Sequence, residues 1–369
     1  MFLRQLSIIN YKNLSQIELD LSPKLNCFIG NNGMGKTNLL DAIYYLSFCK
    51  SHTNPVDSQI IRHNSDFCML QGKYEFPDHS IEEVFCAIRR RQKKQFKRNK
   101  KEYERLSDHI GFIPLVMISP ADNELIIGGS DERRRFMDMV ISQYDKNYMH
   151  SLIRYNRALQ QRNIILKNEE ENIDLSLLEI WEEQITDEGM FIFKKRQAFI
   201  DQFIPIFNRF YTLISRSNET VSLNYISQLK ESDLNLLLKK NRKKDMMLGY
   251  TTIGIHKDDL EMLLNDFPIK KTGSQGQNKT FFVSMKLAQF HFLLETTKNK
   301  PLLLLDDIFD RLDSSRVEEI IKLVLENEFG QIFISDTNRK SLDKMLEKTA
   351  YTDYHLYSVK NGYINQITD

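Results

Sequence analysis

Eight consecutive residues combine glycines, one amine and one hydroxyl at the spacing G-x-x-x-x-G-K-[ST]: Gly30, Asn31, Asn32, Gly33, Met34, Gly35, Lys36 and Thr37. Gly30 and Gly35 permit backbone conformations that direct N–H groups toward phosphate oxygens. Lys36 would place a positive charge near the β and γ phosphates, and Thr37 would offer its hydroxyl to Mg²⁺. The segment predicts a P-loop that holds the phosphates of ATP.

The residues around this loop predict the elements that a P-loop requires. Residues 25–29 form a short apolar run that favours a buried strand. Residues 38–48 favour a helix, with Leu39, Ile43 and Leu46 on one face. The start of that helix would direct its positive end at the bound anion. A chance glycine turn is the alternative, but the order strand, glycine loop, helix argues against it.

Two carboxylates follow a wholly apolar run at residues 301–305. Such a run is typical of a central strand that is covered on both faces. Asp306, at the end of this strand, is positioned to reach the P-loop metal, and Asp307 could orient or deprotonate an attacking water. A pair of strand-end caps is the alternative. Together with the P-loop, the pattern favours a catalytic role.

Ser274, Gly276 and Gln277 precede a helix that we expect over residues 279–294. Ser-x-Gly-Gln at a helix start resembles the signature loop of ABC-type ATPases. In that class, the serine hydroxyl, the glycine N–H groups and the helix dipole bind the γ-phosphate of a nucleotide held by a second copy. A simple helix N-cap is the alternative, because serine is a favoured capping residue.

Two short stretches support the ABC-type interpretation. Leu312-Asp313 resembles the D-loop, and residues 335–337, Ser-Asp-Thr, occupy the switch position. Lys36 and Asp306 lie 270 residues apart, which is far more than in transporter ATPases. The SMC and Rad50 proteins have hundreds more residues as a coiled coil, whereas this chain has no sustained heptads.

The chain is similar over essentially its whole length to the RecF family of bacterial recombination mediators. Several stretches carry this resemblance: Asn10–Leu14, Gly30–Asp41, Lys50–His52, Ser119-Pro120, Arg134–Asp138, Tyr155–Leu159, Gln161–Asn163 and Gly254–Leu260. Three stretches depart from the family pattern. An arginine is lost in Ser51-His52-Thr53-Asn54, the D-loop begins Asp310-Arg311, and Ile255 replaces a proline. None of these changes removes a phosphate or metal ligand.

The resemblance implies an α/β fold, an ABC-type P-loop ATPase head with an inserted, mainly helical second lobe. We expect the head at residues 1–130 and 246–369 and the lobe at 131–245. Alternating patterns predict a hairpin over residues 3–21 and strands over 67–88. Residues 131–210 have a helical pattern, and Pro205 should end or kink the last helix. Further strands are expected near Leu223, 250–255 and 331–335.

By resemblance, the protein binds ATP and Mg²⁺, forms a homodimer around two nucleotides and holds DNA at single-stranded gaps or duplex junctions. It would hydrolyse ATP weakly, with DNA stimulation, and promote recombinase loading with RecO and RecR after DNA damage, in replication restart and the SOS response. A clamp that hardly turns over is an alternative, because Asp307 is one methylene shorter than the glutamate of fast ABC ATPases. The ATPase half of a transporter or nuclease is another.

A dense basic tract predicts the DNA contact. Residues 89–105 contain ten basic and two acidic residues, a net charge of +8. Such a density suits many phosphate contacts without base reading, although a solvated hairpin is the alternative. The predicted DNA-binding residues are Arg89, Arg90, Arg91, Lys93, Lys94, Lys97 and Arg98. A shorter cluster, Lys239, Lys240, Arg242, Lys243 and Lys244, is as easily explained by solvation.

The remaining features suggest a cytoplasmic protein without a zinc site or a disulfide framework. The net charge is only +1, and none of the four cysteines forms a C-x-x-C pair. No signal segment and no apolar run of about 20 residues is present, so we expect no membrane partner. His256, Asp258 and Asp259 could suggest a metal site, but structural roles are favoured because their spacing gives no assured ligand set.

Overall fold

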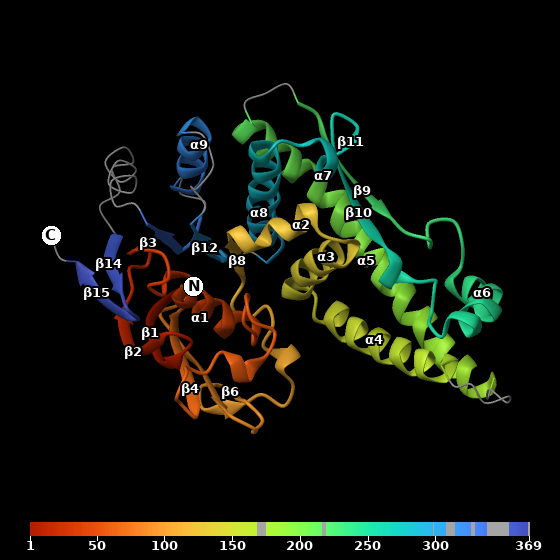
Figure 1. Ribbon diagram of the computed structural model, residues 1–369, viewed down its shortest axis with the longest axis horizontal. Coiled ribbons are helices and arrows are strands. Elements are labelled where there is room, and N and C mark those ends of the chain that lie inside the picture. The colour runs from red at the N-terminus through yellow and green to blue at the C-terminus, as the bar shows by residue number, and fades with distance from the viewer. Residues whose placement is uncertain are drawn as a thin grey trace. The chain divides into compact units, whose positions relative to one another are not determined.

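The computed structural model describes residues 1–167, 175–215, 219–297, 299–307, 314–325, 329–337 and 354–367, and its elements are labelled in Figure 1. The chain forms two compact units. Unit 1 comprises Met1–Asn123, Phe210–Arg216 and Gln275–Asp369. Unit 2 comprises Glu124–Arg209 and Ser217–Ser274. Both ends of the chain therefore build unit 1, and the middle of the chain builds unit 2.

A six-stranded sheet carries the predicted site of unit 1. All of its pairings are parallel except the edge pair formed by the last two strands of the chain. The strands at Leu302–Asp306 and Ile332–Asp336 are buried throughout. Parallel strands end at the same edge of a sheet, so the residues that follow them converge there. The order is β15 (Tyr363–Ile367), β14 (Tyr354–Lys360), β3 (Leu25–Ile29), β13 (Ile332–Asp336), β12 (Leu302–Asp306) and β8 (Leu115–Ile118).

An antiparallel sheet forms the other layer of unit 1 and confirms the strands predicted over residues 3–21 and 67–88. Helix α1 (Lys36–Phe48) contacts strands of both sheets. Nearly all of its residues are therefore buried, rather than the single face expected from sequence. The order is β2 (Leu14–Asp20), β1 (Phe2–Tyr11), β4 (Phe67–Glu75), β5 (Ile81–Arg89), β6 (Gln95–Arg98) and β7 (Lys101–Glu102).

Unit 2 is mainly helical, as predicted for residues 131–210. It also contains a three-stranded antiparallel sheet, in the order β11 (Phe267–Pro268), β10 (Asp259–Leu264), β9 (Val221–Ile226). Its helices are α2 (Glu124–Ile127), α3 (Ser130–Tyr144), α4 (Lys146–Leu166), most of α5 (Leu175–Ser215), α6 (Leu234–Leu248) and α7 (Ile269–Thr272). Unit 1 adds α8 (Gln275–Thr297) and α9 (Ser314–Leu325).

Several predictions about boundaries were wrong. Residues 124–130 and 246–274 belong to unit 2 rather than to the head, and Phe210–Arg216 belongs to unit 1 rather than to the lobe. Residues 259–264 lie in unit 2 because β10 pairs with β9. Residues 250–255 form no strand, because Thr251 and Thr252 bond to side chains of α4 and α6 instead of a neighbouring strand. Of the two effects predicted for Pro205, an end or a kink of the helix, the end is wrong, because α5 continues to Ser215. The side chains that follow this proline are buried, which offsets the missing backbone hydrogen bond: Phe207, Phe210, Tyr211 and Ile214.

Candidate nucleotide-binding site

The predicted P-loop connects the end of β3 with the start of α1, as the motif requires. Gly33 and Gly35 have φ angles of 79° and 116°, in the region that favours glycine. Gly30 has no room for a side chain, because a Cβ atom there would lie 2.3 Å from the Val359 carbonyl oxygen of β14. The central sheet and the glycines therefore fix the course of the loop.

Two side chains brace the P-loop. The Lys36 amine is buried and donates hydrogen bonds to the carbonyl oxygens of Gly30 (2.8 Å) and Asn31 (3.3 Å). The amine thus lies under the loop that we predict to hold the phosphates. The Asn13 side chain donates to the Gly33 carbonyl (3.2 Å) and accepts from the Asn38 amide (2.8 Å). Asn13 therefore connects the first hairpin to the middle of the loop and to the first turn of α1.

The predicted metal ligands meet at the carboxyl edge of the central sheet. The Thr37 hydroxyl donates to Asp306 Oδ1 at 3.2 Å. Ser335, at the predicted switch position on the neighbouring strand, donates to the same oxygen at 2.5 Å. Burial raises the pKa of the Asp306 carboxyl, while hydrogen bonds from Ser335 and Thr37 act against this shift. A hydroxyl and a carboxylate side by side are the hard oxygen ligands that Mg²⁺ prefers.

Asp307 lies next to this pair, and its backbone is held by the same serine. Its N–H group donates to both the Ser335 carbonyl and the Ser335 hydroxyl, each at 3.3 Å. Its φ angle of 43° is uncommon for a residue other than glycine. A residue held in such a conformation beside predicted metal ligands is consistent with a role in catalysis.

Sequence reasoning missed the role of Asp41, a fully buried carboxylate on α1, one turn after Thr37. Asp41 accepts hydrogen bonds from Tyr11 (2.6 Å) and Ser51 (2.7 Å) and pairs with the Lys12 amine at 2.5 Å. These partners come from two of the stretches that carry the family resemblance. The stretches therefore fix the P-loop helix against its surroundings, a relation that only the folded chain reveals.

The signature residues form a second group, at the start of α8. This helix begins at Gln275, four residues earlier than predicted, so Gly276 and Gln277 lie in its first turn. Ser274 is exposed immediately before it. The Arg316 guanidinium of α9 donates to the Thr280 hydroxyl at 2.7 Å, and Thr280 donates to the Gly276 carbonyl at 2.9 Å. Leu312 and Asp313 of the predicted D-loop lie outside the described residues.

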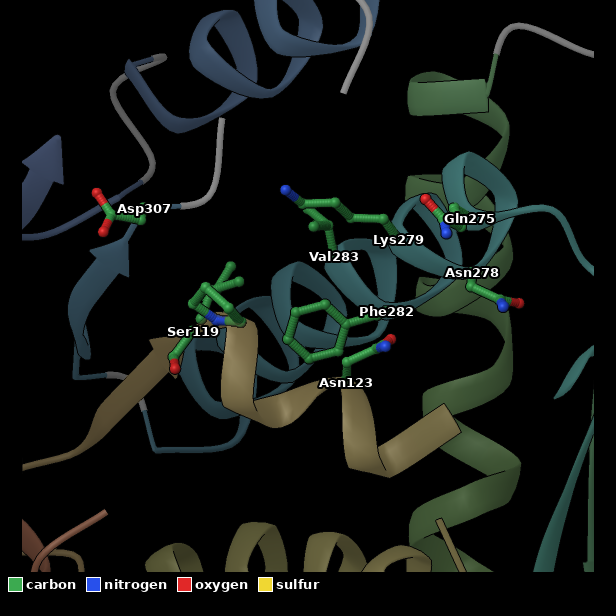
Figure 2. Close-up of a pocket in the computed structure, with 10 residues that line it drawn as sticks. Ser119, Asn123, Gln275, Asn278, Lys279, Phe282, Val283 and Asp307 are labelled. Atoms are coloured by element: carbon green, nitrogen blue, oxygen red, sulfur yellow. The ribbon is translucent and has the colours of Figure 1, made fainter. Parts of the chain in front are cut away.

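A cavity of about 340 Å³ in unit 1 extends between β12 and the first turns of α8. Figure 2 shows Asp307 at one side of this cavity and Gln275 with Lys279 at the other. Phe282 and Val283 supply apolar lining between them. The predicted catalytic carboxylate and the first turn of the signature helix therefore border one common space.

The predicted DNA-binding residues differ in their surroundings. Arg89, Arg90, Arg91 and Lys93 are exposed at the turn between β5 and β6, and Lys97 is half-buried in β6. In contrast, the Lys94 amine pairs with Asp57 at 2.9 Å and donates to the Cys49 carbonyl at 2.6 Å. Arg98 pairs with Glu82 at 2.7 Å and lies 3.8 Å from the centre of the Phe112 ring. Lys94 and Arg98 thus have structural partners within the chain.

The His256 stretch has structural roles, as favoured from sequence. His256 Nδ1 lies 2.8 Å from the Tyr155 hydroxyl, and burial lowers the pKa of this imidazole to about 4. Asp258 pairs with the buried Arg196 at 3.0 Å, and Asp259 pairs with Arg133 at 2.6 Å. The second basic cluster also contains a paired residue, because Arg242 pairs with Glu179 and Glu182. The four lysines of this cluster are exposed.

Comparison with known proteins places the chain in a family. A family model described as "RecF/RecN/SMC N terminal domain" matches residues 2–364. The chain is 61% identical over 369 residues to the "DNA replication and repair protein RecF" of Bacteroides fragilis, covering 100% of this chain and 99% of that protein. The chain belongs to the RecF family. The RecF of Porphyromonas gingivalis is 50% identical, with 99% of this chain and 100% of that protein covered.

Solved structures of the RecF family have the same fold. A structure described as "the recombination mediator protein RecF-ATP in RecFOR pathway" matches with a TM-score of 0.89 and 28% identity, over 100% of this chain and 98% of that one. An Smc head domain from Pyrococcus furiosus, with a TM-score of 0.58 and 15% identity over 99% of this chain and 96% of that one, shares the fold alone. The ABC-type ATPase fold predicted from sequence is therefore confirmed. Among the described residues, no helix is long and apolar enough to span a membrane.

Proposed function

We propose that the protein is a cytoplasmic, ATP-dependent DNA-binding protein of recombinational repair and replication restart. The observation that carries this proposal is the contact between Thr37 and Asp306 Oδ1, 3.2 Å apart, at the start of a P-loop helix. A RecF-family chain that has these groups in place has the phosphate and metal ligands that ATP and Mg²⁺ require. The RecF relatives supply the repair pathway through their names.

The residues have distinct roles in this proposal. Backbone N–H groups of residues 30–35 and the Lys36 amine bind the phosphates, and Thr37 with Asp306 holds Mg²⁺, which neutralises charge on the β and γ phosphates. Asp307 orients or deprotonates the attacking water. Ser274, Gly276 and Gln277 of a second copy cover the γ-phosphate, so ATP promotes a homodimer that holds DNA. RecR and RecO are the partners that the RecFOR pathway suggests.

A clamp that binds ATP and DNA with negligible turnover remains the second candidate. Asp307 has a shorter side chain than the glutamate of fast ABC ATPases, so it reaches less far toward a water on the γ-phosphate. Phosphate release, measured with and without gapped DNA, distinguishes the two functions. We expect slow release that DNA accelerates, whereas a clamp gives negligible release with or without DNA. DNA-independent release would contradict the proposed function.

Neutralising the exposed part of the basic tract should weaken DNA binding. With Arg89, Arg90, Arg91 and Lys93 all changed to serine, we expect lower affinity for every DNA sequence alike. The slope of log affinity against log salt should fall by roughly 0.7–0.9 for each DNA phosphate that the variant no longer neutralises. Fluorescence anisotropy at several salt concentrations measures both quantities.

The second basic cluster provides the matched control for this test. Changing Lys239, Lys240, Lys243 and Lys244 to serine removes the same charge from α6. Affinity and slope close to those of the parent protein are expected there. Lys94 is excluded from the first variant, because its amine already pairs with Asp57 and donates to the Cys49 carbonyl within the chain. An unchanged slope in the first variant would show that DNA binds elsewhere.

A further inference from the structure

Asp122 is a largely buried carboxylate, with a side chain 13% exposed, that lies outside the P-loop and the signature loop and joins three separate parts of unit 1. It lies in the turn after β8. Its Oδ1 atom is 2.9 Å from His52 Nε2 and 3.3 Å from the Lys286 amine. Its Oδ2 atom accepts the Ser119 N–H at 3.0 Å. One carboxylate thus holds together the loop after α1, the end of β8 and the middle of α8.

His52 connects this carboxylate to the nucleotide-binding end of α1. The His52 N–H donates to Asp41 Oδ1 at 2.6 Å. Asp41 follows Thr37 by one turn of α1, and the Thr37 hydroxyl contacts Asp306. The backbone N–H of His52 is thus held by α1, while its imidazole contacts Asp122.

Lys286 connects Asp122 to the helix that begins with the signature residues. Its side chain is 4% exposed and lies about three turns after the start of α8, beyond Gly276 and Gln277. The residues around it on α8 are buried, so the helix has little freedom to bend there. A movement of Lys286 is therefore transmitted along the helix to its first turn.

Lys286 and His52 favour the ionised form of the Asp122 carboxyl. Burial alone would raise the pKa of the Asp122 carboxyl, but Lys286 and His52 outweigh burial and hold this pKa below its ordinary value. The carboxylate therefore stays ionised between its two partners. A buried charge that loses one partner is destabilised, so α1 and α8 constrain each other's positions through Asp122.

We propose that Asp122 is a positioning residue that couples nucleotide binding at α1 to the signature end of α8, through His52 on one side and Lys286 on the other. The inference rests on the proposed function, because the P-loop must bind ATP for any coupling to occur. Through this coupling within one chain, ATP at the P-loop sets the positions of Gly276 and Gln277 before a second copy docks.

Hydrogen exchange followed by mass spectrometry tests the coupling in the monomer. The protein is diluted until sedimentation shows monomers with ATP present, so that dimer contacts cannot protect α8. In the parent protein, we expect ATP to slow exchange in the P-loop and also, by about fivefold or more, in α8. In Asp122→Asn, ATP should still protect the P-loop but leave exchange in α8 within about twofold of its nucleotide-free rate.

A second variant distinguishes a loss of coupling from a loss of folding. Asp122→Asn leaves the Lys286 amine buried without its carboxylate, whereas Asp122→Asn with Lys286→Met removes both charges. We expect the double variant to regain thermal stability but not the response of α8 to ATP. Asp57→Asn is the matched control, because it breaks another carboxylate–lysine pair of unit 1. This control should keep the response of α8.

The possible outcomes separate the coupling from the proposed function. Protection of α8 by ATP in both Asp122 variants would overturn the coupling. A parent protein in which ATP protects the P-loop but not α8 would also overturn it, while ATP binding would stand. If ATP protects neither segment of the parent, both the coupling and the proposed function are wrong.

Discussion

Lys36→Ala is expected to weaken ATP binding by the monomer roughly tenfold to a hundredfold. The amine lies 2.8 Å from the Gly30 carbonyl oxygen of the P-loop, where it would offset the charge of bound phosphates directly. A hydrogen bond to a charged group contributes about 1.5–3 kcal/mol, which corresponds to this change in Kd. Titration with a fluorescent ATP analogue measures the effect. Lys24→Ala, an exposed lysine of the same unit, is the control and should bind normally.

Asp306→Asn is expected to separate ATP binding from ATP hydrolysis, in contrast to Lys36→Ala. We expect ATP binding to remain and phosphate release to fall by on the order of 100-fold or more, because the carboxylate acts through the metal and the developing charge. Asp307→Asn should likewise bind ATP but release little phosphate. Normal binding in Lys36→Ala, or parental turnover in Asp306→Asn, would contradict the assignment of this site.

The P-loop and Asp306 could be predicted because their signals are local in sequence. A glycine pattern between a strand and a helix, and a carboxylate after an apolar strand, each occupy a few consecutive residues. Ser335 could also be predicted, because the switch position lies at the end of a recognisable strand. The parallel pairing of β12 with β13 then brings Asp306 beside Ser335. Local patterns sufficed where regular sheet geometry completes the site.

The supports of the site could not be predicted, because they depend on side chains that meet only in the folded chain. Nothing near Asp41 or Asp122 in the sequence indicates that one accepts from Tyr11 and the other pairs with Lys286. The basic tract gives the converse case. Sequence alone treats Lys93 and Lys94 alike, whereas burial beside Asp57 gives Lys94 a structural role.

Pro205 shows why local propensity misplaced an element boundary. Proline in a helix interior costs about 3 kcal/mol or more, which predicts an end or a kink. Burying one large apolar side chain returns about 1.5–3 kcal/mol, and Phe207 and Tyr211 are both buried after Pro205. Tertiary burial therefore extends α5 beyond the residue that would end an isolated helix.

Ser274→Arg is expected to leave ATP binding by the monomer nearly normal while it prevents ATP-dependent dimerisation and hydrolysis. In the proposed function, one chain supplies the P-loop, Lys36, Thr37 and Asp306 to one nucleotide. Ser274 is exposed just before the first turn of α8, where it can approach the γ-phosphate of a nucleotide held by another copy. A long cation at this position obstructs the close approach that Gly276 permits.

Sedimentation with ATP and with ADP measures this effect. The parent should dimerise with ATP and remain monomeric with ADP, which lacks the bridging γ-phosphate, and Ser274→Arg should remain monomeric with both. Ser80→Arg adds the same cation to the exposed turn after β4 and should behave like the parent. A Ser274→Arg protein that dimerises normally, or a parent that stays monomeric with saturating ATP and DNA, would refute the shared site.

Mixing two inactive variants tests whether the sites are shared between copies. A heterodimer of Ser274→Arg with Lys36→Ala has one composite site that carries both substitutions and one that carries neither. If signature residues act on the partner's nucleotide, the intact site should restore part of the phosphate release, up to about half of the parental rate where each site turns over alone. If they act only within their own chain, every site in the mixture carries one substitution, and activity should not recover. Recovery on mixing therefore requires residues of two chains at one nucleotide.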